Sequence, residues 1–197
     1  MDKLIEKCLE FVKNFFENES SGHDYYHTLR VYNTANHILE TEKADKLLVK
    51  LAALLHDVDD IKISPNTNKH KDNARKFLSM NNVDKDTIEK VCDIIGEISY
   101  KGIETKPSKT IEGKIVQDAD RLDALGAIGI ARAFAYGGNH NRVMHDPLEK
   151  PMLNMTEIEY RNHISTTINH FYEKLFKLKD LMKCHNQNNF HEKIVIY

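Results

Sequence analysis

Hydrophobic residues recur three or four positions apart along most of the chain, which is the spacing of an amphipathic helix rather than of a strand. The first such run comprises Leu4, Ile5, Cys8, Leu9, Val12, Phe15 and Phe16. The same spacing predicts further helices over residues 24–40, 44–58, 70–80, 85–99 and 109–136. Gly126 predicts a break within the last of these segments.

A final long helix is predicted from Thr156 to about Lys183. It opens with the sequence Thr-Glu-Ile-Glu, a capping box in which the hydroxyl and the second carboxylate bind free backbone amides. Segments 64–69 and 137–155 contain Pro with Asn or Gly and are predicted to be loops. Only residues 194–197 alternate as a strand does. The sequence therefore predicts an all-α fold.

The chain length and its charge limit the classes of protein to consider. A chain of 197 residues is long enough for one domain with a sizeable core, which we expect over residues 1–197. The 28 Lys and Arg nearly balance the 30 Asp and Glu, for a formal charge of −2. Without a global positive field, a nucleic-acid polymer or an anionic membrane is not expected as a partner.

The cysteines and the length of the apolar runs indicate the compartment. The three cysteines, Cys8, Cys92 and Cys184, are far apart and odd in number, which argues against a disulfide framework and fits a reducing compartment. The longest run of small apolar residues, 124–131, is too short to cross a bilayer. These features predict a cytoplasmic protein.

Three His-Asp dipeptides occur in a chain with eleven His, where chance predicts roughly one. They are His23-Asp24, His56-Asp57 and His145-Asp146. The first precedes a predicted helix and the third lies in a predicted loop, so helix capping and turn formation explain both. The second ends an apolar helix that we expect to be buried. An imidazole and a carboxylate buried there need partners, because burying either one unpaired is costly.

A metal ion would satisfy the buried His56-Asp57 pair. Two further candidate ligands lie on other predicted helices. His27 lies on the helix predicted from residue 24, and Asp120 lies in an apolar segment that holds two other carboxylates. Three carboxylates in such surroundings are unlike a solvated helix face.

These residues resemble the HD-domain metal-dependent phosphohydrolases, a family named for its His…His-Asp…Asp ligands. The matching segments are residues 23–31 (HDYYHTLRV), 54–60 (LLHDVDD) and 117–126 (QDADRLDALG). The resemblance continues through residues 129–132 and 170–175 to about Lys183, and it leaves 184–197 as a divergent tail. It implies a single helical HD domain with a metal site between central helices, similar to small bacterial members of the family.

The resemblance implies a ligand set and catalytic residues. The implied metal ligands are His27, His56, Asp57 and Asp120. Asp57 and Asp60 are the implied catalytic residues, with Asp60 positioning the attacking water; a solvated acid at a helix end is the alternative for Asp60. Two imidazoles and two carboxylates suit one Mn²⁺, Fe²⁺, Ni²⁺ or Mg²⁺ ion, because they leave open positions on a six-coordinate ion. A second metal is left open, with His70 as its candidate ligand.

Cations near this centre are candidate phosphate-binding residues, because Arg binds phosphate through two parallel contacts and Lys as a point charge. They are Arg30, Lys62, Lys101 and Arg121, and His23 is a further candidate for substrate contact. Arg30 is equally suited to brace a buried acid, and His23 to capping and loop contacts.

We expect the protein to hydrolyse a phosphoester or phosphoanhydride bond of a small phosphorylated metabolite, and a nucleotide or deoxynucleotide is the leading candidate. A nucleotide pyrophosphohydrolase is one form of this activity. The alternative is a metal-holding regulatory module that binds a nucleotide without turnover. A di-iron redox enzyme would need ligands beyond those assigned, and only His70 is available. A homodimer is left open.

Overall fold

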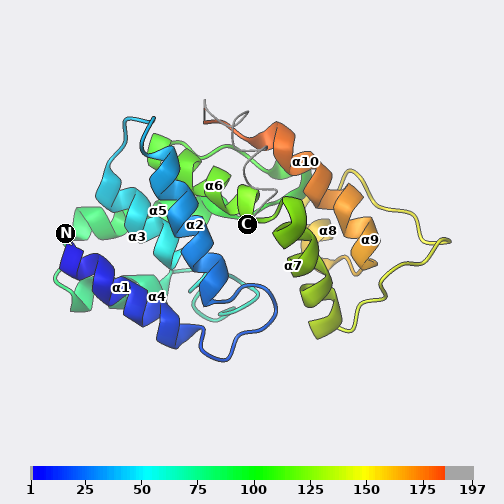
Figure 1. The fold of residues 1–197 in the computed structure, drawn as a ribbon, viewed down its shortest axis with the longest axis horizontal. Helices are drawn as coiled ribbons and strands as arrows, with labels where there is room; N and C mark the ends of the chain where they lie inside the picture. The colour runs from blue at the N-terminus through cyan, green and yellow to red at the C-terminus, as the bar shows by residue number, and fades with distance from the viewer. Residues whose placement is uncertain (1, 185–197) are drawn as a thin grey trace.

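A computed structural model of the chain describes residues 2–184, and every regular element within that range is helical (Figure 1). The all-α fold predicted from the spacing of hydrophobic residues is therefore confirmed. The alternating segment 194–197 lies outside the described residues. Across the described part of the chain, none of the helices combines the length and the apolar character needed to span a membrane.

Six helices form a bundle that contains most of the hydrophobic core. They are α1 (Asp2–Phe15), α2 (Tyr25–Ile38), α3 (Lys46–Leu55), α4 (Asp72–Met80), α5 (Lys85–Ile98) and α6 (Ile111–Asp123). The central helix, α3, packs against α1, α2, α5 and α6. Residues 51–55 of α3 are all apolar and fully buried. A helix that is apolar on all sides is stable only inside a core, so the polar residues that follow α3 also lie inside the molecule.

One long helix and several short ones form a second group beside the bundle (Figure 1). They are α7 (Gly126–Asn139), α8 (Glu157–Asn162), α9 (Thr167–His170), the π-helical turn η2 (Phe171–Leu175) and α10 (Phe176–Leu178). Two 3₁₀ turns, η1 (Gly102–Glu104) and η3 (Lys179–Leu181), complete the described elements. The loop between α7 and α8 extends along the outer edge of this group (Figure 1). One cavity is lined by residues from both groups.

A turn at Gly126 separates α6 from α7, as the sequence predicts. The φ angle of Gly126 is +63°, in the left-handed region that a residue with a side chain rarely adopts. Gly129 lies against the carbonyl oxygen of Ala124 so closely that a Cβ would clash with it. The two glycines allow the sharp change of direction that takes α7 out of the bundle.

The prediction of a single long helix from Thr156 to about Lys183 is wrong, because the structure has several short helices in this range. Its predicted capping box is present, because the Thr156 hydroxyl accepts a hydrogen bond from the Glu159 amide and the Glu159 carboxylate accepts one from the Thr156 amide. The chain leaves helical geometry after α8, at residues 163–166, and re-enters it at α9. Hydrophobic spacing did not reveal this interruption.

Side-chain hydrogen bonds account for the interruption. The buried Glu173 carboxylate accepts hydrogen bonds from the His163 ring and the Ser165 hydroxyl, at 3.1 and 3.0 Å. The Thr166 hydroxyl then caps α9 by accepting from the Asn169 amide. A buried carboxylate requires such donors, and a continuous helix would have spread them around its circumference.

Asp59 fixes the start of α4, and its replacement is expected to destabilise the protein. Its buried carboxylate accepts hydrogen bonds from the Asn73 and Ala74 amides, at 3.1 and 2.9 Å. Asp59→Ala leaves both amides without this acceptor and should lower the free energy of unfolding by roughly 2 to 4 kcal/mol in a denaturant titration. Asp72→Ala, at an exposed site in the first turn of the same helix, should change it little. An equal loss in both variants would contradict this role.

Candidate metal centre

The first turn of α2 carries His27 into the interior. Asp24 caps this helix, as the sequence predicts, and its Oδ1 accepts a hydrogen bond of 2.7 Å from the His27 amide. The His27 ring is fully buried, and its Nδ1 lies 2.7 Å from Oδ2 of Asp123. Because a carboxylate accepts, Nδ1 donates this hydrogen bond, and Nε2 of the neutral ring carries a lone pair.

The buried end of α3 presents His56 and Asp57. His56 is the C-cap residue, and its Nδ1 donates a hydrogen bond of 2.8 Å to the carbonyl oxygen of Ala53. This bond sets the tautomer of the neutral ring, so Nε2 carries the lone pair. Asp57 follows in the turn after α3 and is also buried.

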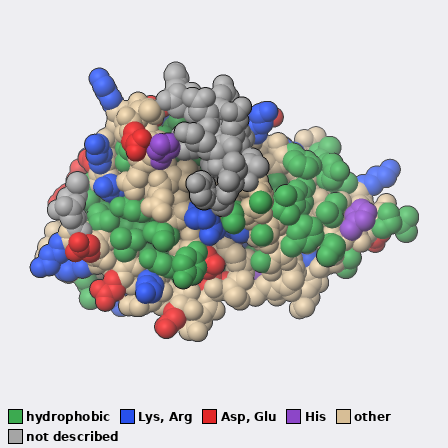
Figure 2. Space-filling view, in the orientation of Figure 1, with side chains coloured by type: hydrophobic (Ala, Val, Ile, Leu, Met, Phe, Trp, Pro, Cys, Tyr) green, Lys and Arg blue, Asp and Glu red, His purple; other side chains and the backbone are tan. Residues whose placement is uncertain are grey.

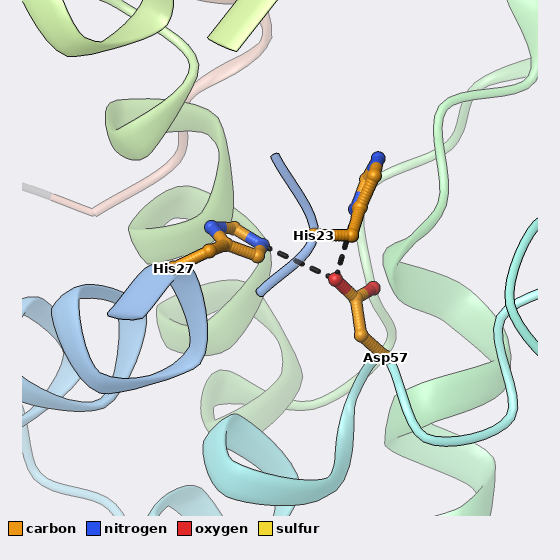
Figure 3. A group of neighbouring side chains, drawn as sticks. All are labelled: His23, His27 and Asp57. Carbon is orange, nitrogen blue, oxygen red and sulfur yellow. Dashed lines mark hydrogen bonds and ion pairs between the residues drawn. The ribbon is translucent and has the colours of Figure 1, made fainter. Parts of the chain in front are cut away.

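The four predicted metal ligands lie close together. Nε2 of His27 is 3.2 Å from Nε2 of His56 and 3.2 Å from Oδ2 of Asp57. On α6, Oδ1 of Asp120 lies 3.5 Å from Nε2 of His27. Figure 3 shows that the rings of His23 and His27 both lie beside one carboxylate oxygen of Asp57. Segments that are far apart in the sequence thus present four donor groups to one position.

The chemistry of this donor set fits a divalent cation. One donor atom each from His27, His56 and Asp120 lies within 4.8 Å of the others. Lone pairs and carboxylates at such separations repel unless positive charge lies between them. Burial acts to lower the pKa of His56, but the charges of Asp57 and Asp120 outweigh burial and raise that pKa to about 9. A divalent ion would replace this proton and neutralise the carboxylates more completely.

Asp123, to which the sequence assigns no role, holds His27 in place from behind. Besides the His27 ring, it accepts two hydrogen bonds from Arg30, at 2.6 and 3.0 Å, and one of 2.9 Å from Arg132. Burial acts to raise the pKa of Asp123, but the hydrogen bonds from His27 and Arg30 hold it well below its usual range. The feature of the sequence that could have identified Asp123 is its position three residues after Asp120, on a neighbouring face of the same helix.

Three of the predicted phosphate-binding cations have protein partners. Arg30 bonds to Asp123, as its alternative interpretation describes. Arg121 lines the cavity but donates to Asp118 at 3.3 Å. Lys101 lies 3.6 Å from a carboxylate oxygen of Glu157. Their contacts with substrate stay predictions.

Residues near the C-terminal end of the described chain bind to α6. Arg121 donates a hydrogen bond of 2.6 Å to the carbonyl oxygen of Leu181. Oδ2 of Asp118 accepts hydrogen bonds from the Lys183 and Cys184 amides, at 2.7 and 2.8 Å. Asp118 and Arg121, the charged residues before and after Asp120 on α6, therefore anchor residues 181–184.

His23, Lys62 and Asp60 line the cavity beside Asp57. Nδ1 of His23 lies 3.0 Å from Oδ2 of Asp57, and its Nε2 lies 3.5 Å from the Lys62 ammonium. The Asp60 carboxylate accepts hydrogen bonds from the Lys62 amide at 2.9 Å and the Ser99 hydroxyl at 3.4 Å. The structure thus brings these three predicted site residues to the donor cluster.

His70, the candidate ligand for a second metal, lies elsewhere. It lines a separate cavity, together with residues of α5 such as Asp93 and Glu97. Neither of the candidate metal-binding groups found among residues 2–184 includes it. The described geometry therefore gives His70 no contact with the four clustered residues.

A cavity of about 560 Å³ opens over the donor cluster, and the second helix group forms much of its wall. Residues of that wall to which the sequence assigns no role include Tyr136, Arg142, Tyr160, His170 and Lys174. His170 and Lys174 are four residues apart, and a shared polar face on the predicted last helix was the available signal for them. The spacing of residues in the sequence does not identify Tyr136 or Arg142 as part of the cavity wall.

Comparison with known proteins agrees with this geometry. Residues 24–125 match the HD domain family. The chain is 36% identical to YpgQ of Bacillus subtilis over 182 residues, which cover 91% of this chain and 81% of YpgQ. A crystal structure of YpgQ in complex with ADP matches with a TM-score of 0.70 and 31% identity, over 97% of this chain and 90% of that one.

Two further solved structures match nearly the whole chain. A Lactobacillus plantarum protein has a TM-score of 0.89 and 36% identity, covering 99% of this chain and 91% of its own. An HD-superfamily hydrolase from Bacillus thuringiensis has a TM-score of 0.68 and 40% identity, covering 100% and 91%. Since the family match also includes the clustered His and Asp residues, the chain belongs to the HD-domain family of metal-dependent phosphohydrolases.

Proposed function

We propose that the protein hydrolyses a phosphoester or phosphoanhydride bond of a nucleotide or deoxynucleotide. The observation that carries this proposal is the convergence of His27, His56, Asp57 and Asp120 beneath a cavity that also holds cations and aromatic rings. The ADP found in the crystal structure of YpgQ supports the nucleotide as substrate class. A cavity of about 560 Å³ is within the size range of small-ligand sites.

A divalent metal held by these four residues would polarise a phosphoryl oxygen and acidify water. The protein supplies the remaining steps. Asp60, held in position by the Lys62 amide and the Ser99 hydroxyl, orients the attacking water and accepts its proton. The Lys62 ammonium, close to His23, offsets the negative charge that develops on the phosphoryl oxygens.

Aromatic side chains give the cavity a surface on which a base can stack. Tyr100 and Tyr160 line it with ring centroids 5.0 Å apart and ring planes at 78°. Tyr136 lines it near His23, with ring centroids 6.2 Å apart. Stacking on an aromatic ring accepts any base, so these rings favour a nucleotide without selecting one.

Removal of Asp57 is expected to abolish activity. Asp57→Ala should lower the turnover of a nucleotide panel with Mn²⁺ by at least about 1,000-fold, because the metal loses a ligand and the phosphoryl group loses its orientation. Chromatography of the nucleotide products and metal analysis of the purified protein check this. Asp146→Ala, in the His-Asp pair of the outer loop, is the matched control and should keep full activity.

Unchanged turnover in Asp57→Ala would reject the proposed function. If the unaltered protein binds nucleotide tightly but releases no product after long incubation, the chain is a binding module instead. Both results are read from the same product assay combined with a binding titration.

Asp60→Asn should lower kcat by about 100-fold, because an amide cannot accept the proton of the attacking water. The KM and the Mn²⁺ content should stay near those of the unaltered protein, since Asp60 is assigned neither metal nor substrate. Asp180→Asn, at an exposed acid of η3, is the control. A normal kcat in Asp60→Asn would remove Asp60 from the reaction.

Asp123→Asn should weaken Mn²⁺ binding by about 10- to 100-fold, because the partner that orients a ligating imidazole controls its affinity. Arg30→Met should produce a smaller loss in the same direction, since Arg30 bonds to Asp123 and not to the donor cluster. Titration with Mn²⁺ followed by electron paramagnetic resonance measures both. Arg75→Met, which removes an ion pair with Glu89 outside this cavity, is the control. Equal Mn²⁺ affinity in all three variants would contradict the positioning role.

A further inference from the structure

The cations that line the cavity fall into two sets. Three of them form ion pairs, Arg121 with Asp118, Arg132 with Asp123 and Arg161 with Glu157. The other three are Lys62, Arg142 and Lys174. Within residues 2–184, none of these three has a carboxylate within ion-pair distance. The second set therefore brings positive charge to the cavity without a directly paired carboxylate among the described residues.

The three cations of this second set line the same cavity wall as His170 and Tyr136. The Lys62 ammonium and the Arg142 guanidinium lie 5.5 and 5.2 Å from the centroid of the same ring, that of Tyr136. Burial and the charges of Lys174, Lys62 and Arg142 together lower the pKa of His170 to about 3. His170 is thus neutral over the ordinary pH range and adds an uncharged N–H group to a positively charged surface.

Lys174 lines the cavity from the π-helical turn η2. The Tyr100 hydroxyl donates a hydrogen bond of 3.2 Å to the carbonyl oxygen of Glu173, so a side chain from the bundle supports this turn. The Tyr100 ring centroid also lies 5.8 Å from the Lys174 ammonium. π-helical turns are uncommon and occur frequently at functional sites. The adjacent Glu173 does not pair with Lys174, because its carboxylate binds His163, Ser165 and the Met152 amide.

Positive groups gathered in this way oppose folding. Burial lowers the pKa of Lys174, and each cation of the set repels the other two. An anion with several acceptor oxygens would offset both effects. Phosphate provides this chemistry, since it accepts parallel hydrogen bonds from Arg, point-charge contacts from Lys and a bond from a neutral imidazole.

We infer that Lys62, Arg142 and Lys174, together with His170, form a phosphate-binding subsite in the wall of the cavity that contains the metal centre. The inference rests on the proposed function and adds to it the residues that hold the phosphate part of the substrate. Two of these residues, Arg142 in the loop after α7 and Lys174 on η2, lie outside the segment that matches the HD domain family. The metal ligands come from the bundle, and the proposed phosphate subsite combines Lys62, which lies between α3 and α4, with residues that follow α7.

Titration calorimetry of the Mn²⁺-loaded protein with inorganic phosphate tests the subsite without requiring turnover. Lys174→Met and Arg142→Met should each raise the Kd for phosphate at least tenfold, the loss expected for one charge-assisted contact. Lys179→Met, at an exposed lysine of η3, should leave it unchanged. Adenosine, which has no phosphate, should bind equally well to all four proteins.

Metal content and thermal midpoint separate this role from a structural one. Both variants should retain Mn²⁺, and Lys174→Met without phosphate should unfold at or above the temperature of the unaltered protein, because a buried unpaired charge is removed. A lower midpoint would indicate that Lys174 stabilises the fold instead, and would overturn its place in the subsite.

The two proposals fail differently. If the unaltered protein binds phosphate through these residues but hydrolyses no nucleotide, the subsite is retained and the proposed function is rejected. If both variants bind phosphate as the unaltered protein does, and hydrolyse nucleotide with an unchanged KM, the subsite is rejected and the proposed function is retained.

Discussion

The crowding of two imidazoles and two carboxylates at the buried end of α3 is the constraint on which the surrounding structure depends. Each ring has its outer nitrogen occupied, that of His27 by Asp123 and that of His56 by the Ala53 carbonyl. Neither ring can turn its inner nitrogen away without breaking a buried hydrogen bond, which is costly. Arg30 and Arg132 in turn neutralise Asp123. The protein thus holds unfavourable contacts in place with bonds made on the outer side of the cluster.

The bundle could be predicted from the sequence because its helices are determined by local signals and burial. Asp24 caps α2, Gly126 ends the α6 segment, and the apolar run before His56 makes α3 central. The resemblance to the HD-domain family supplied the set of four candidate ligands, and the structure places these four residues close together. Hydrophobic spacing failed after α8, where the hydrogen bonds of Glu173 with His163 and Ser165 decide the path of the chain.

The candidate substrate residues were harder to predict, because a cation in a sequence does not reveal its partner. Arg30 and Arg121 are close in sequence to His27 and Asp120, yet both bond to protein carboxylates. Lys174 is more than fifty residues from the nearest of the four clustered residues, yet it lines the same cavity from the π-helical turn. The sequence shows which cations are close to a candidate ligand along the chain. Which charges stay unpaired is decided by tertiary contacts.

The anchoring of residues 181–184 to Asp118 and Arg121 has a consequence for how the protein matures. These contacts link the helix that carries Asp120 to a segment about sixty residues further along the chain. During synthesis the bundle emerges first, since domains form from the N-terminus onward. Asp118 and Arg121 of α6 gain these contacts only after residues 181–184 have left the ribosome. The four clustered residues His27, His56, Asp57 and Asp120 all precede α7, so they can come together before α6 gains its contacts with residues 181–184.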